Sequence, residues 1–307
     1  MRERKNACLL CPRGCGVDRT IGGGYCGGGT EVKVARASLH MWEEPCISGE
    51  AGSGTVFFSG CPLKCVFCQN RTIALGDKGK TLTSRQLAQL FLLLQEKGAA
   101  NVNLVTPTHF VPQIAQALRA AKADGLTLPI VYNTSGYERV ETLRMLDGLV
   151  DIYLPDMKYY SRESAARYAN APDYFECASS ALREMVRQVG KPVFDSTLSG
   201  GSLMRRGVIV RHMVLPGHVK DSKMVIKYLY DTYQHSIYLS IMNQYTPPDM
   251  DGYPEISRRV TRREYDRVVD YAIALGVENA FIQEGNTAQE SFIPDFDEDV
   301  FLKELLK

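Results

Sequence analysis

The stretch GTVFFSGCPLKCVFCQN (54–70) joins a short apolar run to three closely spaced cysteines. Its first seven residues are rich in β-branched and aromatic side chains between glycines, which predicts a buried strand. Cys61, Cys65 and Cys68 follow on the loop after this strand, in the pattern Cys-x3-Cys-x2-Cys. Three thiolates on one tight loop can ligate three irons of a [4Fe–4S] cluster and leave the fourth iron open. A zinc site would need a fourth ligand nearby, and none follows in the sequence.

On the C-terminal side of this stretch, strand-like runs alternate with helical patterns. Further strands are predicted at 101–106, 128–133, 151–156, 207–215 and 236–243, with one more at 279–285. Helices are predicted at 84–97, 111–123, 140–146, 178–189, 220–233 and 262–275. Such alternation is typical of right-handed βαβ units in an α/β fold with parallel strands. Six units predict a partial, TIM-like (β/α)6 barrel, and a doubly wound sheet is the alternative.

The N-terminal side of the stretch has a different composition. Residues 1–50 are rich in cysteine and glycine and show little periodicity, so they cannot bury much apolar surface. We therefore expect a metal-binding, cysteine-rich extension over 1–50, and a barrel core with C-terminal helices over 51–307. A bound metal, or packing on the core, would keep the extension ordered.

Composition and charge exclude several classes of protein. The chain has 36 Lys and Arg against 35 Asp and Glu, and its basic residues are dispersed, which disfavours a nucleic-acid substrate. The apolar runs are far shorter than the ~20 residues of a membrane span, and the N-terminus lacks the apolar segment of a secretory signal. We expect a cytoplasmic protein without a membrane partner. Eight of its nine cysteines precede residue 69, which indicates metal ligation rather than disulfides.

In either α/β fold the chemistry is expected at the C-terminal ends of the strands. Thr106, Asn133, Asp156 and Gln244 occupy or directly follow such ends. Lys158 follows the fourth predicted strand, where an ammonium group can pair with a cofactor carboxylate. The alternative for Asp156 and Lys158 is a surface ion pair at the start of a loop.

The cysteine pattern, with aromatic Phe67 before the last cysteine, resembles the signature of the radical S-adenosylmethionine (SAM) superfamily. This resemblance implies a [4Fe–4S] cluster on Cys61, Cys65 and Cys68 and SAM as the cofactor. A reduced cluster of this kind gives one electron to SAM, which releases methionine and a 5′-deoxyadenosyl radical that abstracts hydrogen. The implied electron donor is a flavodoxin- or ferredoxin-like protein.

Residues 54–245 resemble pyruvate formate-lyase activating enzyme and its homologues most closely. Asn70-Arg71, Asn133-Thr134-Ser135-Gly136 and Asp156-Met157-Lys158 match motifs of that group. The resemblance implies that Asn133 and Ser135 contact SAM, that Lys158 pairs with its carboxylate, and that Asp156 helps to bind a monovalent cation. Arg211, on the fifth predicted strand, either reaches the cofactor or forms an ion pair with a residue outside the cofactor site.

The chain departs from this group at three places. Thr106-Pro107-Thr108 stands where the superfamily often has Gly-Gly-Glu, and the Thr106 or Thr108 hydroxyl could accept the SAM amino group instead. The stretch 50–54 lacks the arginine of glycyl-radical activases, and Gln244 replaces a histidine as the expected ribose contact. The resemblance implies activation of a glycyl-radical protein. The alternatives are modification of a peptide or small metabolite, and a noncatalytic iron–sulfur carrier.

A second cysteine set, Cys8, Cys11, Cys15 and Cys26, lies in the extension. Nearby glycines let the backbone fold closely around a metal. Four cysteines suit structural zinc or an auxiliary iron–sulfur cluster, and independent thiols are the remaining alternative. His40 and Cys46 either approach one of the two sites or have a buried structural role.

Overall fold

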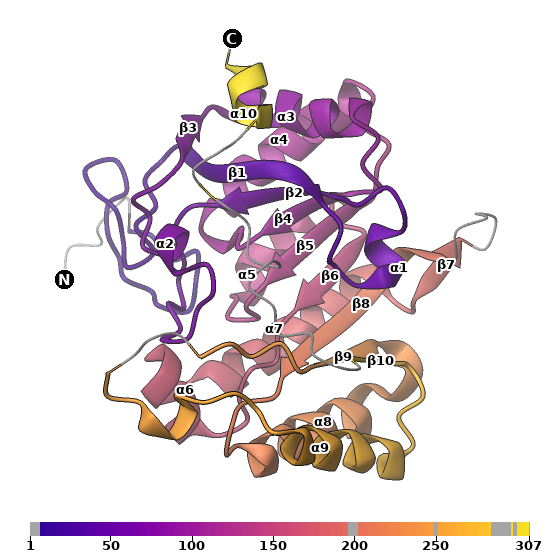
Figure 1. Ribbon diagram of the computed structural model, residues 1–307. Helices are drawn as coiled ribbons and strands as arrows, with labels where there is room; N and C mark the ends of the chain where they lie inside the picture. The colour runs from indigo at the N-terminus through magenta and orange to yellow at the C-terminus, as the bar shows by residue number, and fades with distance from the viewer. Residues whose placement is uncertain (1–6, 196–201, 248–250, 284–295, 297–299, 307) are drawn as a thin grey trace.

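The computed structural model describes residues 7–195, 202–247, 251–283, 296 and 300–306. These residues form one ten-stranded sheet and the helices and loops around it (Figure 1). The strand order is β10-β9-β8-β6-β5-β4-β2-β1-β3, with β7 paired to β8. The strands are β1 (Val32–His40), β2 (Ser53–Phe58), β3 (Lys80–Leu82), β4 (Val102–Val105), β5 (Ile130–Thr134), β6 (Ile152–Pro155), β7 (Val193–Asp195), β8 (Leu203–Met213), β9 (Tyr238–Met242) and β10 (Ala280–Ile282).

The strands from β2 to β10, apart from β3 and β7, pair in parallel. The sheet is therefore a partial TIM-like barrel whose two edge regions do not pair with each other in the described residues. This confirms the α/β class and the mostly parallel sheet, and the seventh predicted strand is present as β10.

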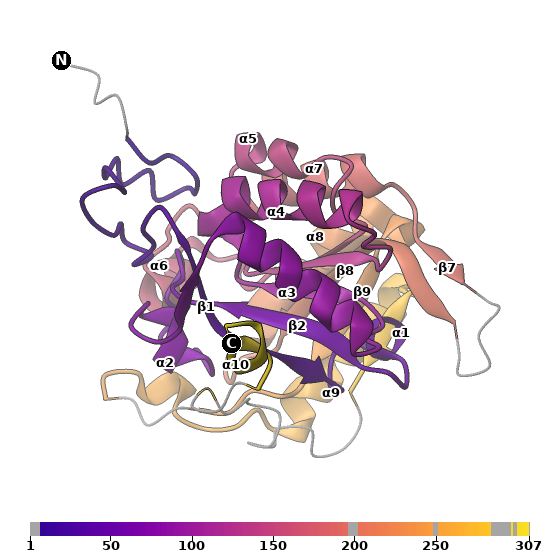
Figure 2. The same cartoon turned by 90° about the horizontal axis from the view of Figure 1, so that it is seen from above.

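Most helices lie on the connections between the parallel strands, and the longer ones cover the outer face of the sheet (Figure 2). The short helices at 45–48 and 71–74 instead pack against its other face. They are α1 (Pro45–Ser48), α2 (Arg71–Ala74), α3 (Ser84–Glu96), α4 (Val111–Ala123), α5 (Val140–Leu143), α6 (Arg162–Ala169), α7 (Tyr174–Val189), α8 (Val219–Tyr233), α9 (Arg262–Leu275) and α10 (Val300–Leu305). Among the described residues, none of the helices is both long and apolar enough to span a membrane.

Local sequence signals explain why these helices form. Thr83 caps α3 in a reciprocal capping box with Gln86, which contributes about 1 kcal/mol. The buried side of α3 carries Leu87, Leu90 and Leu94, spaced three and four residues apart. Capping and periodicity thus agree in placing α3 against the sheet.

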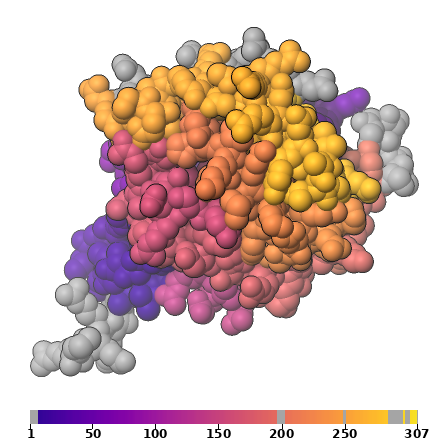
Figure 3. Space-filling view, turned by 90° about the horizontal axis from the view of Figure 1, so that it is seen from below, coloured from indigo at the N-terminus to yellow at the C-terminus, as the bar shows by residue number. Residues whose placement is uncertain are grey.

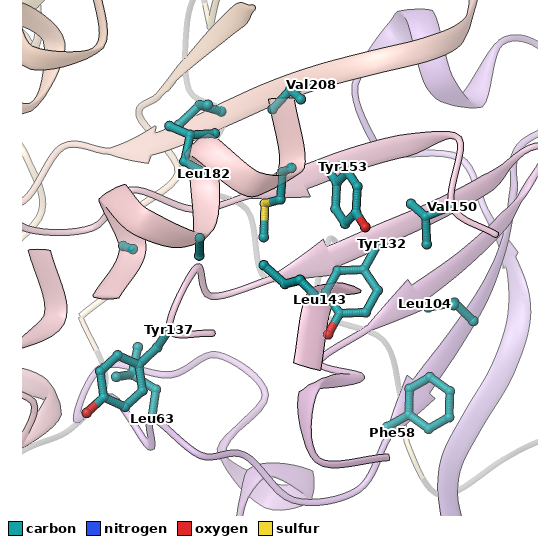
Figure 4. Close-up of a cluster of buried hydrophobic side chains, with 14 of the residues drawn as sticks. Phe58, Leu63, Leu104, Tyr132, Tyr137, Leu143, Val150, Tyr153, Leu182 and Val208 are labelled. Carbon is teal, nitrogen blue, oxygen red and sulfur yellow. The ribbon is translucent and has the colours of Figure 1, made fainter. Parts of the chain in front are cut away.

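The main core lies between the sheet and its helices. Figure 4 shows part of this cluster, including Leu104, Tyr132, Tyr153 and Val208 from neighbouring strands. The rings of Tyr132 and Tyr153 lie 5.7 Å apart in an edge-to-face arrangement. Burying each large apolar side chain contributes about 1.5–3 kcal/mol, so this layer fixes the relative register of the strands.

The sequence did not predict the antiparallel additions to the sheet. β1 pairs with β2 and β3, and β7 pairs with β8. Because β1 lies before residue 50, the extension contributes one strand to the main sheet, whereas residues 7–31 consist of turns, bends and an isolated bridge. The boundary near residue 50 stays a prediction. In the view from below, the first described residues (indigo) form a lobe at one edge of the molecule (Figure 3).

Candidate active site

The loop from β2 to α2 carries Cys61, Cys65 and Cys68. Between these cysteines, Leu63 and Phe67 are almost fully buried and anchor the loop to the core. The Phe67 ring centroid lies 5.7 Å from that of Tyr245, and 6.5 Å from those of two further tyrosines, Tyr159 and Tyr168. Apolar packing on both sides of Cys65 therefore fixes the course of the loop.

Hydrogen bonding and burial act in opposite directions on these thiols. The Leu63 amide donates to Cys61 Sγ at 3.4 Å, and the Asn70 amide lowers the pKa of Cys68. Burial dominates, and raises the pKa of Cys65 to about 12 and that of Cys68 to about 11. The thiols are thus neutral until a metal replaces their protons, which a coordinated cation does outright.

The cysteine loop opens on a cavity of about 230 Å³ at the C-terminal ends of the strands. All the predicted radical-site residues except Thr108 line this cavity: Cys61, Cys65, Phe67, Cys68, Thr106, Asn133, Ser135, Asp156, Lys158, Arg211 and Gln244. The structure thus brings together residues from five different strand ends and the cysteine loop.

Buried charges form the floor of the cavity. Lys158 Nζ lies 2.6 Å from one Asp156 oxygen, and Arg211 Nε lies 3.0 Å from the other. Burial alone would raise the pKa of Asp156, but Lys158 and Arg211 together hold it below its usual value. Arg211 also donates to Asn133 Oδ1 at 2.6 Å. The ion pair is therefore in the cavity and not on a surface loop, and Arg211 joins the same network.

Sequence reasoning missed Glu43, which enters the cavity from the turn between β1 and α1. Its carboxylate accepts from Asn103 at 2.9 Å and from Asn133 at 3.3 Å, and lies 3.5 Å from Arg211 Nη1. The alternation of apolar and polar residues in Val32-Lys33-Val34 was the available signal for β1. Once β1 is placed, the acidic pair Glu43-Glu44 that follows it becomes a candidate for the site. His40 also lines this cavity, whereas Cys46 packs in a separate apolar cluster.

Thr108 is not among the residues that line the cavity, and its hydroxyl binds a second missed carboxylate, Glu138. Thr108, Thr134 and Tyr132 all donate hydroxyl groups to Glu138 Oε1, at 2.6, 2.5 and 3.2 Å. The second oxygen, Oε2, is buried without a hydrogen-bond partner. Burial raises the pKa of Glu138 to about 7. This carboxylate ties together the turns that follow β4 and β5.

The N-terminal cysteines gather beside the cysteine loop of the barrel. The Cys11 and Cys26 thiols are buried, and burial is the main factor that raises the pKa of each. Neighbouring cysteines raise the pKa further: Cys26 and Cys8 act on Cys11, and Cys8 and Cys15 act on Cys26. The Gly28 amide donates to Cys26 Sγ at 3.4 Å, and a Cβ on Gly24 would come within 2.9 Å of Cys15 Sγ. Amides directed at sulfur, and a backbone with no room for side chains, fit a metal-thiolate site.

Neither cysteine set is already arranged for a single ion. Among the described residues, no three or more His, Cys, Asp or Glu side chains form a group that could hold one metal. Cys61, Cys65 and Cys68 nevertheless line one cavity, and three thiolates on one loop are suited to a [4Fe–4S] cluster. The cavity also fits SAM, since the Ser135 hydroxyl is buried there without a partner.

Sequence comparison with known proteins finds a family model and a relative. The sequence model of the radical SAM superfamily matches residues 55–229. An uncharacterized protein of Methanocaldococcus jannaschii, MJ0674, is 27% identical over 278 residues, which span 86% of this chain and 74% of that protein.

Two solved structures show the same fold. A radical SAM methyltransferase from Sphaerobacter thermophilus aligns with a TM-score of 0.54 and 14% identity, over 85% of this chain and 79% of its own. Streptococcus suis SuiB bound to S-adenosylmethionine aligns with a TM-score of 0.50 and 14% identity, over 74% of this chain and 48% of its own. At such low identity the likeness concerns the fold alone.

Proposed function

Because the chain belongs to the radical SAM superfamily, we propose that it cleaves SAM reductively at the cavity beside Cys61, Cys65 and Cys68. Membership implies a [4Fe–4S] cluster and SAM. When bound, these supply the 5′-deoxyadenosyl radical that abstracts a hydrogen atom from a substrate. One observation carries the proposal: three thiols, a buried lysine and an unpartnered hydroxyl face one cavity at the strand ends.

The residues of this chain have separate tasks in the proposal. The three cysteines hold the cluster, and Phe67 packs against the core so that the loop keeps its course. Lys158 pairs with the SAM carboxylate, while Asn133, Ser135 and Thr106 offer polar groups to the rest of the cofactor. Gln244 contacts the ribose. Asp156 and Arg211 hold Lys158 and Asn133 in position, and Asp156 also contributes to a monovalent-cation site.

Electron paramagnetic resonance of the reduced protein tests this arrangement. Adding SAM should change the signal of the cluster in the wild-type protein and in Cys177→Ala, whose thiol lies on α7 and contacts Asp173. Cys68→Ala should lose both the cluster and the response. A cluster signal that SAM leaves unchanged in every protein would contradict the proposed site.

The first candidate acceptor of the radical is a glycyl-radical protein. The match of Asn70-Arg71 and Asp156-Met157-Lys158 to the activating-enzyme motifs supports it. Co-incubation with a candidate partner, SAM and reductant should create an organic radical on that partner. Absence of such a radical across several partners would reject this acceptor.

A second candidate acceptor is a small metabolite or peptide with a charged group. A second cavity, of about 360 Å³, is lined by Trp42, Glu43, Glu44 and Arg211, and it shares Glu43 and Arg211 with the first. The charged side chains that the two cavities share suit a polar ligand better than the uncharged backbone of a glycine residue. Deuterium transfer from a labelled substrate into 5′-deoxyadenosine would identify it, and Glu43→Gln should weaken the binding of that substrate more than the binding of SAM.

The remaining assignments concern partners and the extension. A flavodoxin- or ferredoxin-like donor can approach the back of the cysteine loop, where Lys64 and Arg71 flank Cys65 and Cys68. Cys8, Cys11, Cys15 and Cys26 hold a second iron–sulfur cluster or zinc, which metal analysis of the Cys11→Ala protein tests. All nine cysteines are free, which suits the cytoplasm.

A further inference from the structure

Arg13, which lies between Cys11 and Cys15, binds the backbone of the barrel's cysteine loop. Its Nε donates to the Pro62 carbonyl at 2.8 Å, and its Nη2 donates to the Leu63 carbonyl at 3.3 Å. The same guanidinium donates to the carbonyls of Ala169, at 2.8 Å, and Asn170, at the C-terminal end of α6. These carbonyls lack partners within the helix, and a cation there is favourable. One side chain thus joins the extension, the cysteine loop and α6.

Aromatic rings fix the position of this guanidinium. Its central carbon lies 4.4 Å from the ring centroid of Tyr25, in the extension, and 5.2 Å from that of Tyr137, in the core. Lys64, in the cysteine loop, lies 5.0 Å from the same Tyr25 ring. Figure 4 shows Leu63 and Tyr137 within one buried cluster. The stacking and the four carbonyl bonds leave Arg13 little freedom to move.

The peptide group between Pro62 and Leu63 connects Arg13 to the first cysteine of the barrel. Its carbonyl accepts from Arg13, and its N–H, on Leu63, donates to Cys61 Sγ at 3.4 Å. Hydrogen bonds in such a chain polarise one another, so the charged donor strengthens the N–H···S bond. Hydrogen bonds to the sulfurs and nearby charge are among the factors that set the reduction potential of an iron–sulfur cluster.

At its other end, Arg13 interacts with the N-terminal cysteine set. Its backbone amide forms a hydrogen bond to the Cys11 thiol. A separate contact joins the same two regions: a Cβ on Gly60 would collide with the Cys26 carbonyl oxygen, so the backbones meet directly beside Cys61. Movement of the N-terminal set is therefore transmitted to the loop that carries Cys61.

We propose that Arg13 is a positioning residue that couples the two cysteine sites: a metal in the N-terminal set fixes Arg13, and Arg13 makes the barrel cluster easier to reduce. The inference rests on the proposed function, in that it requires a cluster on Cys61, Cys65 and Cys68. The redox step is the transfer of one electron from an added reductant to the oxidised cluster, and no bond of Arg13 is made or broken.

The test is a potentiometric titration of the intact metal-loaded protein with dithionite, followed by electron paramagnetic resonance. Arg13→Met should lower the equilibrium constant for reduction about tenfold, which corresponds to a potential about 59 mV more negative for a one-electron couple. Arg13→Lys should recover part of the shift, since a lysine keeps the charge but loses the forked donor geometry. Arg262→Met, on the exposed surface of α9, is the matched control and should titrate like the wild type.

Cys15→Ser tests the coupling itself, because Cys15 is an exposed member of the N-terminal set. It should lose the N-terminal metal and shift the potential in the same direction as Arg13→Met. An unchanged potential in Arg13→Met at full iron content would overturn the inference, and a shift in Arg13→Met without one in Cys15→Ser would overturn the coupling. If Arg13→Met does not fold, Arg13→Lys and Cys15→Ser decide the outcome. Failure of the wild-type protein to assemble any barrel cluster would instead refute the proposed function.

Discussion

Replacing Lys158 by methionine removes one charge from the floor of the cavity and keeps an unbranched side chain of similar length. Lys158 Nζ lies 2.6 Å from Asp156 Oδ2, and both side chains are largely buried, at 17% and 13% exposure. Burial alone would lower the pKa of Lys158, but the charge of Asp156 raises it above its usual value, so the ammonium group is charged at neutral pH. If this ammonium receives the SAM carboxylate, its loss weakens SAM binding directly.

The magnitude follows from the kind of bond that is lost. A hydrogen bond to a charged group contributes about 1.5–3 kcal/mol. Since about 1.4 kcal/mol corresponds to a tenfold change, the dissociation constant for SAM should rise about 10- to 150-fold. The protein should stay folded, because Asp156 keeps its partner Arg211 at 3.0 Å.

Equilibrium dialysis with labelled SAM, on protein of matched iron content, measures this change. Lys227→Met is the control, because Lys227 pairs with Asp231 at 2.8 Å in the same way but on the exposed surface of α8. A Lys158→Met protein that binds SAM as tightly as the wild type would refute the assignment of Lys158 to the cofactor carboxylate.

Three further predictions test the surroundings of the site. Glu138 has a pKa of about 7 when folded, against 4.5 for the free side chain, so the folded state binds the extra proton and stability falls as pH rises from 4.5 to 7. The free energy of unfolding in urea should therefore be up to about 3 kcal/mol higher at pH 5 than at pH 8 in the wild type, and Glu138→Gln should remove this difference. The same difference between the two pH values in Glu138→Gln would show that another group causes it. Phe67→Ala should cost about 3–5 kcal/mol of unfolding free energy, and a loss below about 1 kcal/mol would mean that the loop is anchored elsewhere. Cys68→Ala should lose barrel iron in elemental analysis while Cys177→Ala retains it, and equal retention would place the cluster on other ligands.

The parallel strands were predictable because each is a short, buried, apolar run. Their polar residues fall at the same edge of the sheet, so placing the strands also placed the candidate site. Asn133 pairs in register with Val105, and Asp156 bridges to Arg211. Reading strand ends therefore located most of the cavity lining without any knowledge of side-chain orientation.

Other features depend on contacts between distant parts of the chain. β1 joins the sheet by antiparallel pairing within a cysteine-rich region, and its burial alternates only in part, so the sequence pattern was weak. Missing β1 also meant missing Glu43, which follows it. Thr108 was placed in the cofactor site because it stands where the superfamily often has Gly-Gly-Glu. It does not line the cavity, and its hydroxyl donates to Glu138, thirty residues later in the sequence.

The most direct test of the proposed SAM cleavage is the formation of 5′-deoxyadenosine by the anaerobically reconstituted and reduced protein, quantified by chromatography. The wild type and Cys177→Ala, given a hydrogen donor such as the candidate partner or substrate, should release 5′-deoxyadenosine. Cys65→Ala should release none. The same yield from Cys65→Ala, or no product from a wild-type protein that holds its cluster and binds SAM in the presence of these donors, would contradict the proposed cleavage.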